Sequence, residues 1–143
     1  MIRTLLLAVL GLSLTACGFM GGGAPAAPAA PIPSELAGTV SYGERIALAS
    51  DTQLRVRLEE LGRGDAPPQF IAETTVPRIG PSPVRFRIVL DPRVIDPQRS
   101  YTLTARIERG EQLLFVNDPP LRVLTGGRPS QVEIVVGPAG GRK

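Results

Sequence analysis

The 143-residue chain has no histidine, no tryptophan and one cysteine, and these absences exclude several kinds of chemistry. Without imidazole there is no Ser/His/Asp or Cys/His relay and no histidine metal ligand. A single cysteine cannot form an internal disulfide or a zinc thiolate cage. A carboxylate pair must face one cleft, whereas Glu59 and Glu60 are adjacent on an expected strand and point to opposite faces. We therefore expect a protein that is not an enzyme and has no metal site and no cofactor.

The formal net charge of +3 does not indicate nucleic-acid binding. Between Ser34 and Val136 there are 13 arginines and 13 acidic residues, so this part of the chain is neutral. The remaining basic residues, Arg3, Arg142 and Lys143, lie near the two ends. Binding to DNA or RNA depends on a surplus of basic side chains that face phosphates, and we therefore expect no nucleic-acid partner.

The first sixteen residues have the organisation of a signal peptide. Arg3 supplies the positive start, and residues 5–14 form an apolar run that is too short to span a bilayer. The run ends in Leu14-Thr15-Ala16-Cys17. This order of a leucine, two small residues and a cysteine resembles the lipobox of bacterial lipoproteins. The alternative is an ordinary secretory signal in which the cysteine is incidental.

The lipobox resemblance implies a lipid-anchored protein. In such lipoproteins the chain is cleaved before the cysteine, here Cys17, whose thiol carries diacylglycerol and whose new amino group is often acylated. Two or three acyl chains give lasting attachment to a membrane. The residue after the cysteine is Gly18 rather than the aspartate that favours retention at the inner membrane. The resemblance therefore implies the outer membrane of a Gram-negative bacterium, with the protein facing the periplasm.

Composition divides the chain into four parts. We expect a lipoprotein signal peptide at residues 1–16, followed by the lipidated Cys17 and a flexible Gly/Ala/Pro-rich tether at 17–33. A β-sandwich domain follows at residues 34–137, and residues 138–143 form a disordered tail. The tether contains no run that can bury a core, so its expected task is to hold the domain away from the membrane.

Apolar and polar residues alternate after Ser34, a pattern typical of strands with one buried and one solvated face. The pattern is clear in Leu54, Val56 and Leu58, which alternate with arginines and a glutamate. It predicts an all-β domain, a seven-stranded immunoglobulin-like β-sandwich whose order of strands cannot be derived. We expect the large rings of its core to be Phe70, Phe86, Tyr101 and Phe115. The expected strands cover residues 36–42, 54–59, 70–76, 84–90, 101–108, 112–116 and 131–136.

Asp91 and Asp96 are each followed by proline, and this pattern favours caps on helical turns over a cation site. Four arginines, Arg55, Arg57, Arg85 and Arg87, occupy outward positions of two expected strands. If those strands are neighbours, the guanidinium groups form a cluster that can receive an acidic segment of a partner or an anionic lipid headgroup. The alternative is an ordinary solvated surface on which glutamates balance these charges.

Several segments resemble a known family. Residues 38–48 and 54–59 resemble the opening of the YbaY-like lipoproteins, a group related to the YscW lipoprotein of type III secretion. The resemblance continues through residues 95–97, Tyr101, 105–107, 113–115 and 124–127, and it covers the domain from about Leu36 to Val136. The YscW branch implies a pilotin, a chaperone that escorts a secretin subunit to the outer membrane.

The residues and the resemblance together predict a non-catalytic binding module anchored in the outer membrane. Its expected partners are the membrane, through the acyl chains, and an outer-membrane or secretin protein. Two alternatives remain open at this point. One is a structural or envelope-stress lipoprotein, and the other is a module that binds an envelope glycan or lipid, although the lack of tryptophan disfavours sugar binding.

Overall fold

The computed structural model describes residues 31–43 and 47–140, and within them the chain forms eight strands and one short 3-10 helix. Cys17, the signal peptide and most of the expected tether lie outside the described residues. No helix in the described part has the length and apolar character needed to cross a membrane. The elements are β1 (Glu35–Tyr42), β2 (Thr52–Glu60), β3 (Gln69–Val76), β4 (Val84–Val89), η1 (Pro92–Val94), β5 (Tyr101–Arg109), β6 (Gln112–Val116), β7 (Leu121–Val123) and β8 (Gln131–Pro138).

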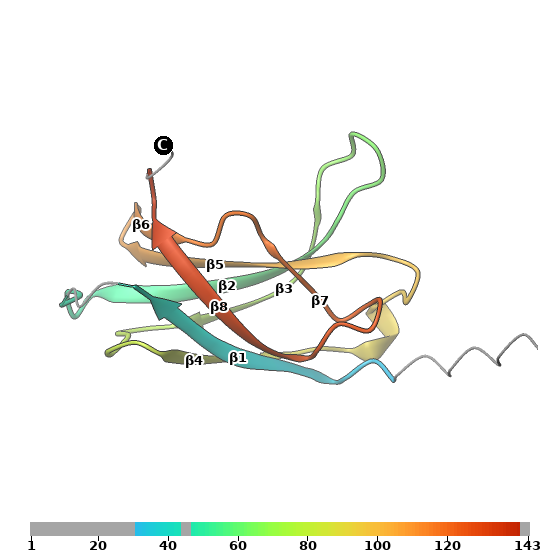
Figure 1. Ribbon diagram of the computed structural model, residues 1–143, viewed down its shortest axis with the longest axis horizontal. Coiled ribbons are helices and arrows are strands. Elements are labelled where there is room, and N and C mark those ends of the chain that lie inside the picture. Colours follow the sequence, from blue (N-terminus) through green and yellow to red (C-terminus); the bar gives the residue numbers. More distant parts are fainter. Residues whose placement is uncertain (1–30, 44–46, 141–143) are drawn as a thin grey trace, which may run out of the picture.

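The strands form one curled sheet, in the order β3-β2-β5-β6-β8-β1-β4, with β7 paired to β5 (Figure 1). This confirms the all-β prediction and all seven expected strands, and it adds the three-residue strand β7. The predicted immunoglobulin-like sandwich was wrong. Strand β8 pairs with β1 through residues 131–136 and with β6 through its end at Gly137 and Pro138. Strand β8 thus joins the part of the sheet formed by β1 and β4 to the part formed by β6, β5, β2 and β3. Through this link the sheet curls into a nearly closed barrel.

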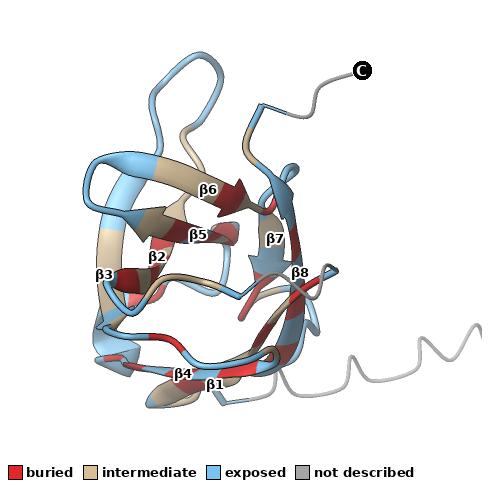
Figure 2. Cartoon of the chain, turned by 90° about the vertical axis from the view of Figure 1, so that its left-hand side faces the viewer, coloured by how far each residue is buried: buried red, intermediate tan, exposed pale blue. Residues whose placement is uncertain are grey.

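The barrel stays open between β3 and β4, the two ends of the strand order. These strands approach each other without a backbone ladder, and the view along the barrel shows them meeting at one corner (Figure 2). Each therefore has one edge that pairs with no strand in the described part of the chain.

Aliphatic side chains fill the interior, as the alternating pattern predicts. Phe86, Tyr101 and Phe115 are buried as expected, and the ring of Tyr42 packs 5.7 Å from that of Phe115. Phe70 was misassigned to the core, because 56% of its surface is exposed. The pairing of β2 with β3 shifts by one residue after Leu58. This bulge turns Phe70 to the outer face of the sheet.

The turns follow the expected chemistry. Asp91 is the N-cap of η1, where its Oδ1 accepts a hydrogen bond from the Arg93 backbone N–H at 3.0 Å. Asp96 accepts from the Gln98 N–H at 2.8 Å. Both contacts confirm the predicted caps. Gly110, with φ of 59°, turns the chain between β5 and β6, a conformation that favours glycine.

The carboxyl end of β8 runs slightly past the expected domain. Pro138 is the last residue of the strand, and the N–H of Ala139 donates to the carbonyl of Leu114 at 2.8 Å. These two residues, which the composition places in the tail, are thus part of the ordered edge of the sheet.

Candidate partner-binding surface

Arg55 and Arg57 lie on the outer face of β2 and contact carboxylates of neighbouring strands. The Nε of Arg57 donates to Glu73 of β3 at 2.9 Å, and its guanidinium lies 5.5 Å from the centre of the Phe70 ring. The Nε of Arg55 lies 3.6 Å from Glu108 of β5 and 3.9 Å from Glu73. Both arginines are therefore already engaged by acidic side chains of the same sheet.

Arg85 and Arg87 lie on the outer face of β4, where their exposed side chains alternate with the buried Val84, Phe86 and Ile88. The Nε of Arg87 is 3.3 Å from a carboxylate oxygen of Glu35, in a pair whose side chains are 69% and 42% exposed. Among the residues that the structure describes, no carboxylate lies within 4.0 Å of Arg85. These two arginines are thus more accessible to a partner than those of β2.

The structure does not bring the four arginines together on neighbouring strands. Strand β2 pairs with β3 and β5, whereas β4 pairs with β1. The opening of the barrel and strand β3 lie between the two pairs of arginines. The sequence prediction of one cluster depended on adjacent strands, and that condition is not met. Partner binding at these arginines stays a prediction, and the geometry favours the pair on β4.

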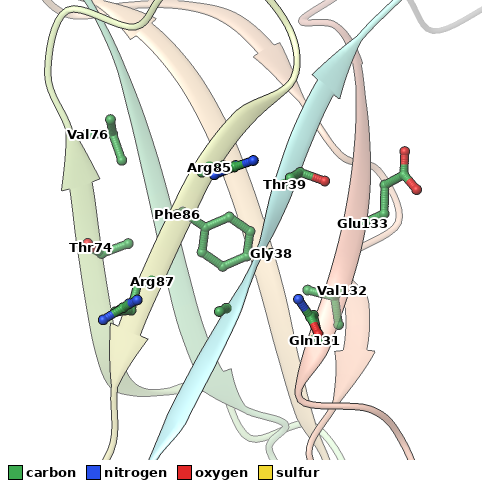
Figure 3. A pocket seen from close by; sticks show the side chains of 11 residues that line it. Gly38, Thr39, Thr74, Val76, Arg85, Phe86, Arg87, Gln131, Val132 and Glu133 are labelled. Atoms are coloured by element: carbon green, nitrogen blue, oxygen red, sulfur yellow. The ribbon is translucent and has the colours of Figure 1, made fainter.

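A hollow of about 800 Å³ lies at the β4 arginines and extends to the open corner of the barrel. Its volume is within the range usual for ligand pockets. Figure 3 shows its lining side chains in four strands, in the order β3, β4, β1 and β8. The lining consists of Thr74 and Val76 of β3, Arg85, Phe86 and Arg87 of β4, Ala37, Gly38 and Thr39 of β1, and Gln131, Val132 and Glu133 of β8.

Small residues of β1 give the hollow its depth. Ala37 and Thr39 lie between longer side chains of β4 and β8, because Ala37 is opposite Arg87 and Gln131 in the two ladders, and Thr39 is opposite Arg85 and Glu133. Gly38 allows the close approach of β1 to β8, since a Cβ there would lie 2.1 Å from the carbonyl oxygen of Val132. The floor of the hollow is therefore formed by the small residues of β1. Its β4 side carries the arginines, and its β8 side carries Glu133 and Gln131.

A second, smaller hollow of about 240 Å³ lies near the start of β5. Its lining is mainly polar and includes Arg99, Arg122, Arg128 and Tyr101. Arg99 is occupied by the carboxylate of Glu60 at 3.0 Å. Within the described ranges, no three carboxylate, cysteine or histidine side chains gather closely enough to hold a metal ion.

The shifted ionisable groups lie outside the large hollow. The guanidinium of Arg109 holds the pKa of Asp51 below its ordinary value, because its Nε donates to the carboxylate at 2.9 Å. Arg93 lowers the pKa of Asp91 in the same way. Burial raises the pKa of Tyr101, whose hydroxyl accepts a hydrogen bond from the Asp96 N–H. None of these three groups is among the residues that line the large hollow.

Sequence reasoning identified the arginines of the hollow but missed its other walls. The small residues of β1 and the acidic end of β8 lie far from β4 along the chain, and the alternation of residues says nothing about which strands are neighbours. One local sign of the hollow is present in the sequence. It is the run of three small residues Ala37, Gly38 and Thr39 in a strand that also contains the large residues Leu36 and Tyr42.

Comparisons with known proteins identify a family for most of the chain. Residues 32–136 match the family described as type III secretion system lipoprotein chaperone (YscW). The chain is 30% identical over 102 residues to the uncharacterized lipoprotein YbaY of Escherichia coli K12, a match that covers 70% of this chain and 54% of YbaY. The chain thus spans about half the length of this curated relative.

A solved structure has the same fold. The structure of an alternative pilotin from the type II secretion system of Vibrio cholerae superposes with a TM-score of 0.69 and 29% sequence identity. The match covers 75% of this chain and 97% of the pilotin.

Proposed function

The chain belongs to the YscW family of type III secretion system lipoprotein chaperones, and we propose that it is a pilotin-like escort for a secretin or another outer-membrane protein. In this role the folded barrel binds the partner, and a lipid anchor supplies transport to the outer membrane. The protein acts by binding and carries out no reaction.

The likeness to the Vibrio cholerae pilotin carries this proposal. It extends over 97% of the pilotin chain, so the two proteins share a whole folded domain rather than one motif. The family description names chaperones, and YbaY is also a lipoprotein. A hollow of about 800 Å³ lies beside a strand edge that has no partner among the described strands, and it provides a surface on which another protein can dock.

The proposal includes acylation of Cys17 and a position in the outer membrane, facing the periplasm. Its support is the Leu14-Thr15-Ala16-Cys17 sequence and the glycine that follows it. Incorporation of labelled palmitate should be lost in Cys17→Ala, because the thiol is the site of lipid attachment. Incorporation that survives this change would contradict the anchor while leaving the binding role untouched.

Deletion of the gene in its own bacterium tests the escort role. We expect secretin subunits to accumulate in the inner-membrane fraction and the yield of heat-resistant secretin multimers to fall. The full chain supplied on a plasmid should restore both, whereas Cys17→Ala should restore neither. A secretin that reaches the outer membrane and assembles normally in the deletion strain would contradict the escort role.

A further inference from the structure

One edge of β4 is free of any strand in the part of the chain that the structure describes, and one hydrogen bond shows which residues face it. The N–H of Leu90 donates to the carbonyl of Ser34 at 2.9 Å, so these residues form a hydrogen-bonded pair. In an antiparallel ladder such pairs alternate with pairs that are not hydrogen-bonded. In the same register, Ile88, Phe86 and Val84 therefore also direct their backbone groups toward β1.

It follows that Arg85, Arg87 and Val89 direct their N–H and C=O groups away from β1, toward the open corner of the barrel. Strand β3 lies there but does not pair with β4. The two arginines of the hollow thus present two kinds of group to a ligand, the backbone edge and the exposed guanidinium. An unpaired edge of this kind is a template for an added strand.

The two sides of this edge differ in chemistry. On the outer side, Arg85 and Arg87 are followed by Val89, which is 77% exposed. On the inner side, Thr74 and Val76 of β3 line the hollow together with the buried Phe86. Side chains of an added strand would alternate between these sides. Its outward positions would meet two cations and then an apolar residue, and its inward positions would meet small or apolar surfaces.

We propose that β4 binds an extended segment of a partner as an added strand, with acidic side chains at two alternate positions opposite Arg85 and Arg87. This proposal rests on the proposed escort function and specifies how the partner is held. Carboxylates match guanidinium groups through paired hydrogen bonds. The exposed Glu35 carboxylate already on Arg87 is a weak competitor, because solvent screens such surface pairs.

Two other occupants fit less well. A second copy that paired β4 with β4 in antiparallel fashion would place arginines of both copies side by side, and like charges on facing strands disfavour that pairing. The tether of this chain, residues 18–33, contains no acidic residue and has proline at four positions, which cannot donate backbone hydrogen bonds. An acidic segment of another protein satisfies both the charge and the backbone requirements.

A synthetic peptide of about nine residues, the length of a long strand, tests the proposal directly. The probe alternates glutamate with valine and carries a fluorescent label, and its binding to the full-length lipoprotein in detergent micelles is measured by fluorescence anisotropy. We expect binding that Arg85→Glu combined with Arg87→Glu weakens by at least about tenfold. The matched control, Arg122→Glu combined with Arg128→Glu, reverses two exposed arginines elsewhere and should leave the affinity unchanged.

N-methylation of the peptide distinguishes strand addition from general charge attraction. In an added strand, the N–H groups of either the glutamates or the valines point at β4, and those of the other residue type point away. Methylation of the amides that point at β4 should abolish binding, and methylation of the other amides should preserve it. Loss on methylating the glutamate amides indicates an antiparallel strand, and loss on methylating the valine amides a parallel one. Val89→Pro, which removes one donor from the free edge, should weaken binding without altering the β1 ladder.

Three results with the peptide would overturn the proposal. They are no binding at about 1 mM peptide, where weak complexes still form, equal effects of the two methylated peptides, and equal effects of the two charge-reversed variants. Dimers of the full chain that Val89→Pro dissolves would assign the edge to a second copy and also overturn it. Failure of the secretin assay alone would reject the escort function while leaving the acidic-strand site intact.

Discussion

Strands β5 and β4 differ in how completely the protein uses their backbone. One edge of β5 pairs with β2 from Tyr101 to Arg109. The other edge pairs with β6 and β7, and between these two strands the side chain of Asn117 takes over. Its Oδ1 accepts from the Ala105 N–H at 2.6 Å, and its Nδ2 donates to the Leu103 carbonyl at 3.0 Å. Strand β4 has one edge that pairs with β1 and one edge that pairs with no strand of residues 31–43 and 47–140.

The charged side chains show the same difference. On the outer face beside β5, Glu73 and Glu108 hold the arginines of β2, and Arg106 lies 3.0 Å from Glu108. On β4, within the described residues, the arginines form one ion pair, the exposed contact of Arg87 with Glu35. Within the described residues, the backbone of β5 is thus used along both edges and the arginines beside it contact carboxylates, whereas β4 keeps one edge without a partner strand and Arg85 without a carboxylate nearby. This contrast is the reason for placing the proposed partner-binding surface on β4.

Removal of the Asn117 amide should cause the largest loss of stability, because this side chain completes the pairing of the β5 backbone. In Asn117→Ala, the N–H of Ala105 and the carbonyl of Leu103 would lose their partners in the core, and each unsatisfied buried group costs about 1–3 kcal/mol. We expect the free energy of unfolding to fall by about 2–5 kcal/mol, a large part of the stability of a small domain. Urea denaturation of the full chain in detergent measures this loss.

The control for Asn117 is Gln112→Ala, an exposed residue at the start of β6. It should change the free energy of unfolding by no more than about 0.5 kcal/mol, as is usual for surface substitutions. Equal stabilities of the two variants would show that water replaces the amide, and the contrast between β5 and β4 would lose its basis.

Local features of the fold were predictable from the sequence, and long-range ones were not. Alternation located seven strands because each buried face repeats every second residue. The caps at Asp91 and Asp96 were predictable because an aspartate needs only the next residues of its own turn. The pairing of β8 with both β1 and β6 was not predictable, because the pattern in residues 131–136 fixes which face is buried and not which strand lies beside it.

The candidate site shows the same limit. The outward positions of Arg85 and Arg87 followed from alternation, but their separation from Arg55 and Arg57 depends on strand order. The exposure of Phe70 depends on a bulge that one extra residue creates in the pairing of β2 with β3. Simple alternation along the strand ignores the bulge and therefore places Phe70 on the buried face. The amide of Asn117 satisfies the backbone of another strand, and a lone asparagine before an aspartate gave no sign of that role.

Tyr101 provides a smaller effect that depends on pH. Its pKa is raised above 10.0 by burial, so the folded state favours the neutral phenol. The stability that this contributes is fully present below the ordinary tyrosine pKa and is lost as the pH rises through the folded pKa. Tyr101→Phe should lower the free energy of unfolding by about 1 kcal/mol near neutral pH, through loss of the bond from the Asp96 N–H. The same substitution should also make the free energy of unfolding fall less steeply as the pH rises above the ordinary tyrosine pKa.

Thr125→Val is the matched variant for this test. It removes a nearby hydroxyl that donates to the Arg99 carbonyl at 2.7 Å but cannot ionise in this range. Denaturation curves on both sides of pH 10.0 should therefore show an unchanged alkaline decline in Thr125→Val. If Tyr101→Phe declines as steeply as the wild type, the buried phenol does not govern alkaline stability.

The smallest expected effect compares one carboxylate from each side of the barrel. Glu73→Gln keeps the shape of the side chain but removes the charge that Arg55 and Arg57 share, in a position only 23% exposed. Glu35→Gln removes the exposed partner of Arg87. Surface ion pairs contribute about 0–1 kcal/mol, so we expect a loss of about 0.5 kcal/mol for Glu73→Gln and almost none for Glu35→Gln. Salt should reduce the first loss, because it screens exposed charges. Equal losses at low salt would mean that β4 holds its arginines as firmly as β2 does, and the open side would then have no charge to offer an acidic strand.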